Sequence, residues 1–204
     1  MQEIIEYLQK TYTPAGIVVY GSYADGSNNA HSDFDALVLT DRSAAKYDNS
    51  TVGGVLLDVF LYPVDTFLQP FACEDFLQLH DGKILLDTTD SLAQAKAKVT
   101  AFVESAAKKS AEEIAHDLSW CEKMRLRAGR GDAEGDYRWH WVLIDSLQIY
   151  YELCGKYYFG PKKALRQMEQ EDPDAFALYS AALRNFTAET LDAWIVHLQS
   201  MQKS

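Results

Sequence analysis

The apolar positions at the start of the chain follow a helical period that gives way to a strand period near residue 17. Ile4, Ile5 and Leu8 fall on one face of a short helix, which Thr13-Pro14 ends. The runs that follow are β-branched or aliphatic, of strand length, and separated by Gly, Asn, Asp and Ser. We expect strands at 17–20, 36–39, 55–62 and 84–86, and a helix over 65–80. This pattern predicts a mixed α/β first half.

From about Ser91 the apolar positions take a helical period and keep it to the end. The expected helices cover 92–127, 137–153, a segment beginning at Pro161, 173–183 and 188–202, with Gly155 as a C-terminal cap and Asp172 and Thr187 as N-caps. The two patterns meet near residues 87–91. The predicted fold class is α+β, with a small mixed β-sheet flanked by helices in domain 1–90 and an all-α helical bundle in domain 91–204.

Composition and charge narrow the classes of protein and of partner. The chain has 204 residues, of which 48% are hydrophobic and 24% charged, as in an ordinary globular protein rather than a disordered one. Nineteen Lys and Arg against 30 Asp and Glu leave a net charge of −11. This negative net charge disfavours a nucleic-acid partner, because such binding depends on basic residues that displace counterions from the phosphates. It favours a cationic or neutral partner.

The cysteines and the amino terminus indicate the cellular compartment in which we expect the protein. Three cysteines that are far apart indicate neither a disulfide framework nor a zinc knuckle. Glu3 and Glu6 interrupt the apolar residues at the start, so we expect no signal peptide. No run approaches the roughly 18 apolar residues of a membrane span. The expectation is a soluble, cytoplasmic protein without a membrane partner.

Residues 18–39 carry the most informative motif, in which a strand runs into Gly21-Ser22. Gly21 allows a sharp turn and a close approach to a ligand. Ser22 falls where a short helix would present free backbone N–H groups, which suit phosphate oxygens. The pair therefore indicates phosphate binding.

Three acidic residues complete this motif. Because strand side chains alternate, Asp33 and Asp35 project to one face, where like charges repel unless a cation lies between them. Asp58 is the lone acid in an otherwise apolar strand, where an unpaired buried carboxylate would be costly. If the two strands are neighbours, the three acids converge on one hard-cation site, such as Mg²⁺ carrying a nucleoside triphosphate.

This motif resembles the signature of the DNA polymerase beta-like nucleotidyltransferase superfamily. That signature consists of Gly-Ser, a spacer, Asp-x-Asp between apolar residues and one further acid in a later strand. The resemblance covers about residues 15–62, and the helical remainder resembles the second domain of antibiotic nucleotidyltransferases of the kanamycin and streptomycin/spectinomycin types. The family resemblance implies transfer of a nucleoside monophosphate, usually from ATP, to a hydroxyl with release of pyrophosphate. It implies Asp33 and Asp35 as metal ligands, Gly21, Ser22 and Ser32 as nucleotide contacts, and Asp58 as a third ligand or the general base.

Two segments of the helical half add weaker candidates by the same resemblance. Residues 155–163 resemble a loop-to-helix segment whose lysine reaches the triphosphate, which makes Lys162 or Lys163 a nucleotide-binding candidate; the alternative is a solvated helix start. Residues 135–138 resemble a Gly-Asp-x-Arg motif whose acid meets a cationic antibiotic, which makes Asp136 a substrate-binding candidate. For Asp136 the alternative is an N-cap of the helix expected from Tyr137.

Asp145 and Glu152 are seven residues apart, so they share one face of the expected helix 137–153. Two acids on a largely apolar helix are candidates for substrate binding in the cleft between the domains. In kanamycin-type relatives a Glu of the helical domain is the general base. Glu152 and Asp145 therefore compete with Asp58 for that role.

The leading hypothesis is a Mg²⁺-dependent nucleotidyltransferase that moves AMP from ATP to a hydroxyl of a small molecule. An aminoglycoside-like antibiotic fits the acidic balance, because polycations are attracted by surplus carboxylates. One alternative is a protein AMP-transferase that acts on a partner protein, and another is a catalytically silent nucleotide-binding module. The triphosphate and a monomeric or homodimeric state stay open at this point.

Overall fold

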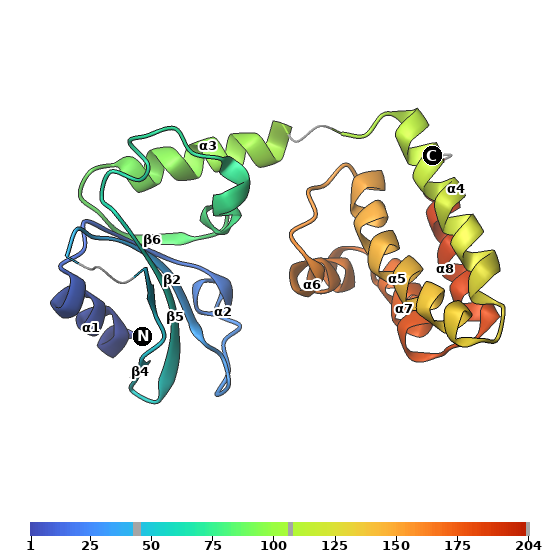
Figure 1. Ribbon diagram of the computed structural model, residues 1–204, viewed down its shortest axis with the longest axis horizontal. Coiled ribbons are helices and arrows are strands. Elements are labelled where there is room, and N and C mark those ends of the chain that lie inside the picture. Colours follow the sequence, from blue (N-terminus) through green and yellow to red (C-terminus); the bar gives the residue numbers. More distant parts are fainter. Residues whose placement is uncertain (43–45, 106–107, 203–204) are drawn as a thin grey trace. The chain divides into compact units, whose positions relative to one another are not determined.

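The computed structural model describes residues 1–42, 46–105 and 108–202. The chain forms two compact units, Met1–Ser105 and Ala106–Ser204 (Figure 1). All the strands of the described residues lie in the first unit, and the second is helical. The predicted α+β class, with a small mixed sheet followed by a helical region, is confirmed.

A mixed β-sheet organises the first unit. Its strands run in the order β3-β5-β2-β1-β6, with β4 paired to β5. β2 and β5 are parallel, whereas the other pairs are antiparallel. The strands are β1 (Gly16–Val19), β2 (Phe34–Leu39), β3 (Tyr47–Asp48), β4 (Thr51–Val52), β5 (Val55–Tyr62) and β6 (Lys83–Asp87). The four expected strands are present, and the short β3 and β4 were not predicted.

Alternating residues of the strands enter two separate cores. Helix α1 (Gln2–Tyr12) covers one face, where Ile4 and Leu8 pack with Val19, Leu57 and Val59. On the other face lie the 3₁₀ helix η1 (Cys73–Leu79) and helix α3 (Ser91–Ser105). These helices contribute Leu79, Leu92 and Val99 to the second core. The side chains of Val18, Leu37 and Leu39 enter the same core from the strands. The sheet is therefore held between α1 and the α3–η1 layer (Figure 1).

The prediction of a helix over residues 65–80 is wrong. Residues 64–68 form turns, and only η1 follows, with a non-helical backbone at Phe76. Pro70 stands between the two parts; it lacks an N–H and disfavours a helical conformation at the residue before it. The apolar residues that mimic a helical period instead form a cluster of aromatic rings in edge contact, made by Phe67, Phe71 and Phe76.

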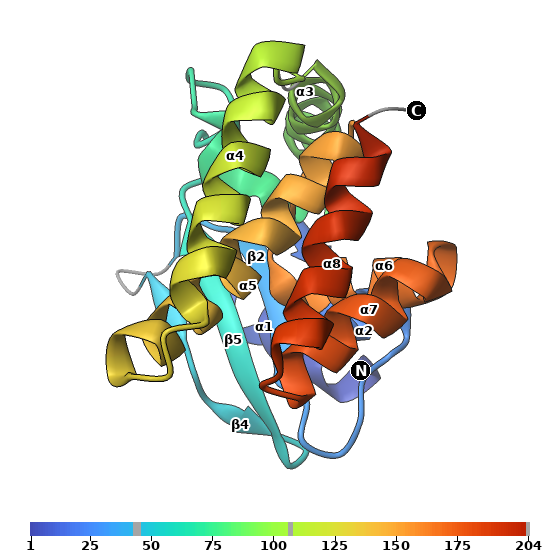
Figure 2. The same ribbon diagram turned by 90° about the vertical axis from the view of Figure 1, so that its right-hand side faces the viewer.

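Five helices make up the described part of the second unit: α4 (Ala111–Ala128), α5 (Ala133–Leu153), α6 (Pro161–Glu171), α7 (Pro173–Arg184) and α8 (Ala188–Met201). Figure 2 shows α4, α5 and α8 packed against one another. The fully buried Trp194 of α8 donates its indole N–H to the hydroxyl of Ser146 on α5 at 2.8 Å. In the ranges the structure describes, no helix has the length and apolar character to cross a membrane.

The single helix expected over 92–127 is in fact two helices, α3 and α4. Ser110 begins α4 with a capping box, because its side chain accepts from the Glu113 N–H and the Glu113 carboxylate accepts from the Ser110 N–H. Since α3 packs on the sheet unit, the compact units divide after Ser105, beyond the boundary expected after residue 90. The Ser-x-x-Glu spacing was the sequence signal for this break.

The start of α5 also differs from expectation. The N-cap is Asp132, whose side chain accepts from the Gly135 N–H at 2.9 Å. The helix therefore begins at Ala133, and Asp136 lies in its first turn. The N-cap interpretation of Asp136 is wrong. The cap at Asp172 is confirmed, since its side chain accepts from the Ala175 N–H at 3.0 Å.

The packing of Trp194 predicts a large loss of stability on truncation. Trp194→Ala should lower the free energy of unfolding of the helical unit by about 3–5 kcal/mol, because it leaves a cavity and removes the partner of Ser146. Val196→Ala, at a position 61% exposed on the same helix, should change it by less than about 0.5 kcal/mol. Urea unfolding followed by tryptophan fluorescence reports this unit, because every Trp of the chain lies in it. Equal effects of the two substitutions would contradict the packing described.

Candidate functional site

Asp35 and Asp58 lie side by side on the parallel strands β2 and β5, where their Cα atoms are register partners. Their neighbours Phe34, Leu57 and Val59 point to the opposite face and are fully buried under α1. Both carboxylates consequently share the other face of the sheet. The condition set in the sequence analysis, that the strands of Asp35 and Asp58 are neighbours, is met.

Asp33 precedes β2 by one residue and is exposed. Its charge acts on the hydroxyl of Tyr47, as does the charge of Asp58. Nowhere in residues 1–42, 46–105 and 108–202 are three or more His, Cys, Asp or Glu side chains grouped so that they could hold a metal ion. The structure thus brings together Asp35 and Asp58 by register and leaves Asp33 outside a closed three-ligand cluster.

The backbone of Gly21 lies directly against the carboxylate of Asp35. Gly21 begins the short helix α2 (Gly21–Asp25) with a φ of 63°, in the left-handed region that favours glycine. A Cβ atom at this position would overlap an Asp35 carboxylate oxygen. The adjacent Tyr20 N–H donates to the Asp35 carbonyl at 3.1 Å. The turn predicted at Gly21 therefore brings the backbone directly against one acid of the pair.

Ser22 and Ser32 have different surroundings. Ser22 is buried in α2, directly after Gly21. The Ser32 hydroxyl accepts from the Asn29 N–H at 2.9 Å, and the Ser32 N–H donates to the Asn29 carbonyl at 3.0 Å. The Ser32 side chain thus supports the turn that leads into β2.

Two tyrosines border the acids and were missed in the sequence. Burial, followed by the charges of Asp58 and Asp35, raises the pKa of Tyr20. The pKa of Tyr47 is raised by desolvation, by the charge of Asp58 and by a hydrogen bond to Asp58. Tyr47 lies in the two-residue strand β3, whose length gives no periodic pattern to recognise.

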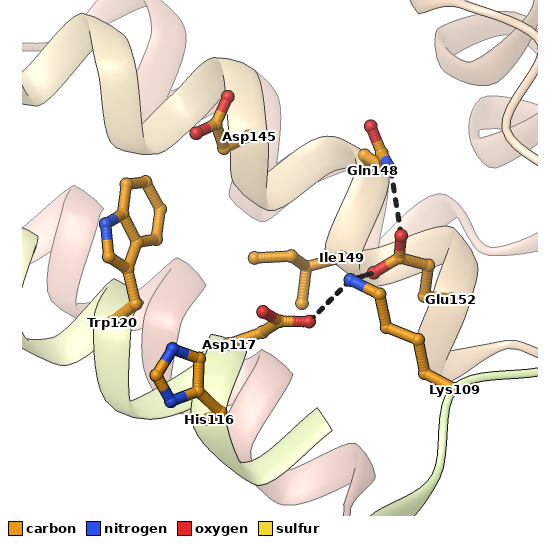
Figure 3. A pocket seen from close by; sticks show the side chains of 8 residues that line it. All are labelled: Lys109, His116, Asp117, Trp120, Asp145, Gln148, Ile149 and Glu152. Atoms are coloured by element: carbon orange, nitrogen blue, oxygen red, sulfur yellow. Dashed lines mark hydrogen bonds and ion pairs between the residues drawn. The ribbon is translucent and has the colours of Figure 1, made fainter. Parts of the chain in front are cut away.

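A pocket of about 380 Å³ lies in the helical unit between α4 and α5. Figure 3 shows its lining: Lys109, His116, Asp117, Trp120, Asp145, Gln148, Ile149 and Glu152. Asp145 and Glu152 were expected to share a face of their helix, and both line this pocket. Trp120 and Ile149 add apolar surface to a lining that is otherwise mostly polar.

Lys109 bridges two acids of this pocket (Figure 3). Its Nζ lies 2.7 Å from Asp117 Oδ2 and 2.8 Å from Glu152 Oε2. Burial alone would lower the pKa of Lys109, but the hydrogen bonds to Asp117 and Glu152 raise it above its ordinary value. Glu152 is also held by the Gln148 amide, which donates to its Oε1 at 2.9 Å. The Glu152 carboxylate is therefore occupied by partners within its own unit.

The remaining candidates lie elsewhere in the helical unit. Lys162 and Lys163 are exposed in the first turn of α6, and the Lys163 ammonium lies 4.5 Å from the centroid of the Phe159 ring. Asp136 is exposed and is not part of the pocket lining. These three residues are not brought together with Asp145 and Glu152 in one pocket of the described residues.

The sheet, the short helix after β1 and the acid pair on β2 and β5 all lie in the part of the chain that matches a known protein family. Residues 1–91 match the family model described as the nucleotidyltransferase domain. This match fits the DNA polymerase beta-like nucleotidyltransferase superfamily, and it supports nucleotidyl transfer in general. Such domains generally use a nucleoside triphosphate and a divalent metal ion.

A solved structure resembles the chain over most of its length. The crystal structure of a nucleotidyltransferase-like protein from Exiguobacterium sibiricum 255-15 has 15% sequence identity and a TM-score of 0.45. The match covers 99% of this chain and 72% of that chain. No curated protein matches the sequence.

The contact between Gly21 and Asp35 predicts a loss of nucleotide binding on substitution. Gly21→Ala should weaken binding of Mg·ATP by at least about tenfold, because the new methyl group displaces the Asp35 carboxylate. Gly26→Ala is the matched control, since Gly26 also has a positive φ, of 81°, but has open space around its Cβ position. Both variants should lose about 1–2 kcal/mol of stability from backbone strain. Calorimetric titration with a non-hydrolysable ATP analogue measures the difference, and equal affinities would contradict the contact.

Proposed function

We propose that the protein is a Mg²⁺-dependent adenylyltransferase that moves AMP from ATP to a hydroxyl of a small cationic molecule and releases pyrophosphate. The observation that carries this proposal is the register pair of Asp35 and Asp58, with the backbone of Gly21 against it. Two adjacent carboxylates on a partly exposed sheet face repel each other, and a divalent cation relieves that repulsion.

The donor set fits a hard cation. Asp35 and Asp58 offer carboxylate oxygens from neighbouring strands, and Asp33 offers another from the exposed segment before β2. In the proposal Asp33 and Asp35 hold the metal, and Asp58 is a third ligand or the base. Bound Mg²⁺ would neutralise charge on the triphosphate and on the departing pyrophosphate. No three His, Cys, Asp or Glu side chains of the described residues, these acids included, are already grouped to hold a metal ion.

In the proposal the residues after β1 bind the triphosphate. Gly21 leaves room for phosphate oxygens beside Asp35, because it has no side chain. Ser22 follows it in α2, and Ser32 shapes the turn before Asp33. Lys162 or Lys163, exposed at the start of α6, is proposed to contribute a positive charge to the triphosphate.

Asp58 is proposed as the general base in preference to Glu152 or Asp145. Glu152 is paired with Lys109 at 2.8 Å and accepts from the Gln148 amide at 2.9 Å, so its carboxylate is already engaged within the helical unit. Asp58 instead lies beside Asp35, on the sheet face proposed to bind the metal and the nucleotide. A base in this place can reach an acceptor hydroxyl that attacks the bound nucleotide.

The helical unit is proposed to bind the acceptor. Its pocket presents Asp117, Asp145 and Glu152 against one lysine, and the indole of Trp120 forms part of the wall. Such a lining suits a molecule with ammonium groups and an apolar ring face, as an aminoglycoside has. In this proposal Asp145 and Glu152 bind the acceptor, and Asp136 is a peripheral contact.

Asp35→Asn should lower the rate of AMP transfer by about 100-fold or more and leave the fold intact, because the amide removes one negative charge at nearly constant volume. Asp65→Asn, in an exposed turn of the same unit, is the control and should keep its activity. Pyrophosphate release with ATP, Mg²⁺ and a panel of aminoglycosides and lincosamides measures the rate. A fully active Asp35→Asn variant would remove the basis of the assignment. A labelled protein band in a lysate without any small-molecule product would instead favour the protein AMP-transferase.

The acceptor pocket predicts a separate effect of Asp145. Asp145→Asn should raise KM for the best aminoglycoside of that panel about fivefold and leave KM for ATP unchanged, because one ion pair at a partly exposed site is lost. The matched control is Asp174→Asn, an exposed acid in the first turn of α7. Initial rates at varied acceptor concentration decide the point. Identical acceptor KM values in both variants would exclude this pocket as the acceptor site.

A further inference from the structure

Tyr47 of strand β3 lies on the same face of the sheet as Asp58. Strand β3 runs antiparallel to β5, with Tyr47 opposite Phe60 and Asp48 opposite Val59. Tyr47 therefore lies on the face of Phe60 and Asp58, whereas Asp48 lies on the buried face with Val59. The rings of Tyr47 and Phe60 pack with centroids 5.2 Å apart, which holds the phenol beside Asp58.

This placement is the one that the proposed reaction requires of an acceptor. An acceptor hydroxyl must donate to the base and lie near the acid pair that binds the nucleotide. Tyr47 is placed to meet both conditions, since it lies on the face of Asp58, opposite Phe60, and Asp58 is the register partner of Asp35. Tyr47 is also 46% exposed, so it is accessible to a bound nucleotide.

We propose that Tyr47 is a site of self-nucleotidylation, in which the chain transfers a nucleoside monophosphate to its own phenol. The inference rests on the proposed nucleotidyl transfer and names an acceptor within the chain itself. A phenol beside the base has no loss of translational freedom on reaction, unlike a diffusing acceptor.

The step balances with the nucleoside triphosphate as the only co-reactant. The Tyr47 oxygen attacks the α-phosphorus, and a new bond from this oxygen to phosphorus forms. The bond from the α-phosphorus to the bridging oxygen of the β-phosphate breaks, and pyrophosphate leaves with the bonding electrons. The phenolic proton passes to the Asp58 carboxylate, which returns it to water. The product is a tyrosyl phosphodiester at position 47.

Other tyrosines near the sheet do not share this placement. The Tyr7 and Tyr12 hydroxyls donate to Asp48 Oδ2 at 3.2 and 2.7 Å, on the face of the sheet that α1 covers. Tyr20 feels the charges of both Asp58 and Asp35, but it is more buried than Tyr47. Tyr7 in particular is a tyrosine with a carboxylate partner away from the acid pair, and so provides a matched control.

Mass spectrometry of the full chain tests the inference. The intact mass is measured as purified and after incubation with ATP and Mg²⁺, and the modified peptide is then mapped. We expect a single AMP group per chain, on Tyr47. It should be absent in Tyr47→Phe, lost in Asp58→Asn, and unchanged in Tyr7→Phe, which removes a phenol bonded to an aspartate on the other face.

The outcomes separate this inference from the proposed function. Pyrophosphate release with a small acceptor and no adduct at Tyr47 would overturn self-nucleotidylation and leave adenylyl transfer standing. An adduct that persists in Tyr47→Phe would overturn it as well. Neither an adduct nor pyrophosphate release with any acceptor would contradict both proposals.

Discussion

The site depends on two like charges held side by side by strand register. Asp35 and Asp58 are partners across the parallel pair β2 and β5, and this pairing is enforced from the opposite face. Leu57, Val59 and Leu61 are buried against α1, so a slip of one residue would carry Asp58 into the core and expose these side chains. The packing of α1 therefore keeps the two carboxylates adjacent, which is the arrangement that the proposed divalent cation requires.

The same sheet face has a covered part and a partly exposed part. Leu37 and Leu39 follow Asp35 on β2 and are fully buried by the α3–η1 layer. Asp35, Asp58 and Tyr47 lie beyond that layer and keep access to solvent. Gly21 brings the backbone up to this region without a side chain. One face of the sheet thus contributes both to a buried core and to an accessible polar site.

The strands and the acid pair were predictable because their signals are local. A lone Asp in the apolar run 55–62 and the alternation around Asp35 marked both acids, and the strand register of the structure places them on one face. The aromatic residues of 65–80 imitated a helical period, although their order comes from ring contacts on either side of Pro70. Tyr47 and Lys109 were not predicted, because neither has a pattern of its own and each acquires its role from partners distant in sequence.

Nucleotidyl transfer differs from phosphoryl transfer in the phosphorus that is attacked, and this difference provides the most direct measurement. The protein is incubated with Mg²⁺, the acceptor panel and ATP labelled either at the α- or at the γ-phosphorus, and the products are separated. The account predicts that the α-label enters the acceptor or the chain and that the γ-label leaves as pyrophosphate. A γ-label found on an acceptor, or released only as orthophosphate, would contradict it.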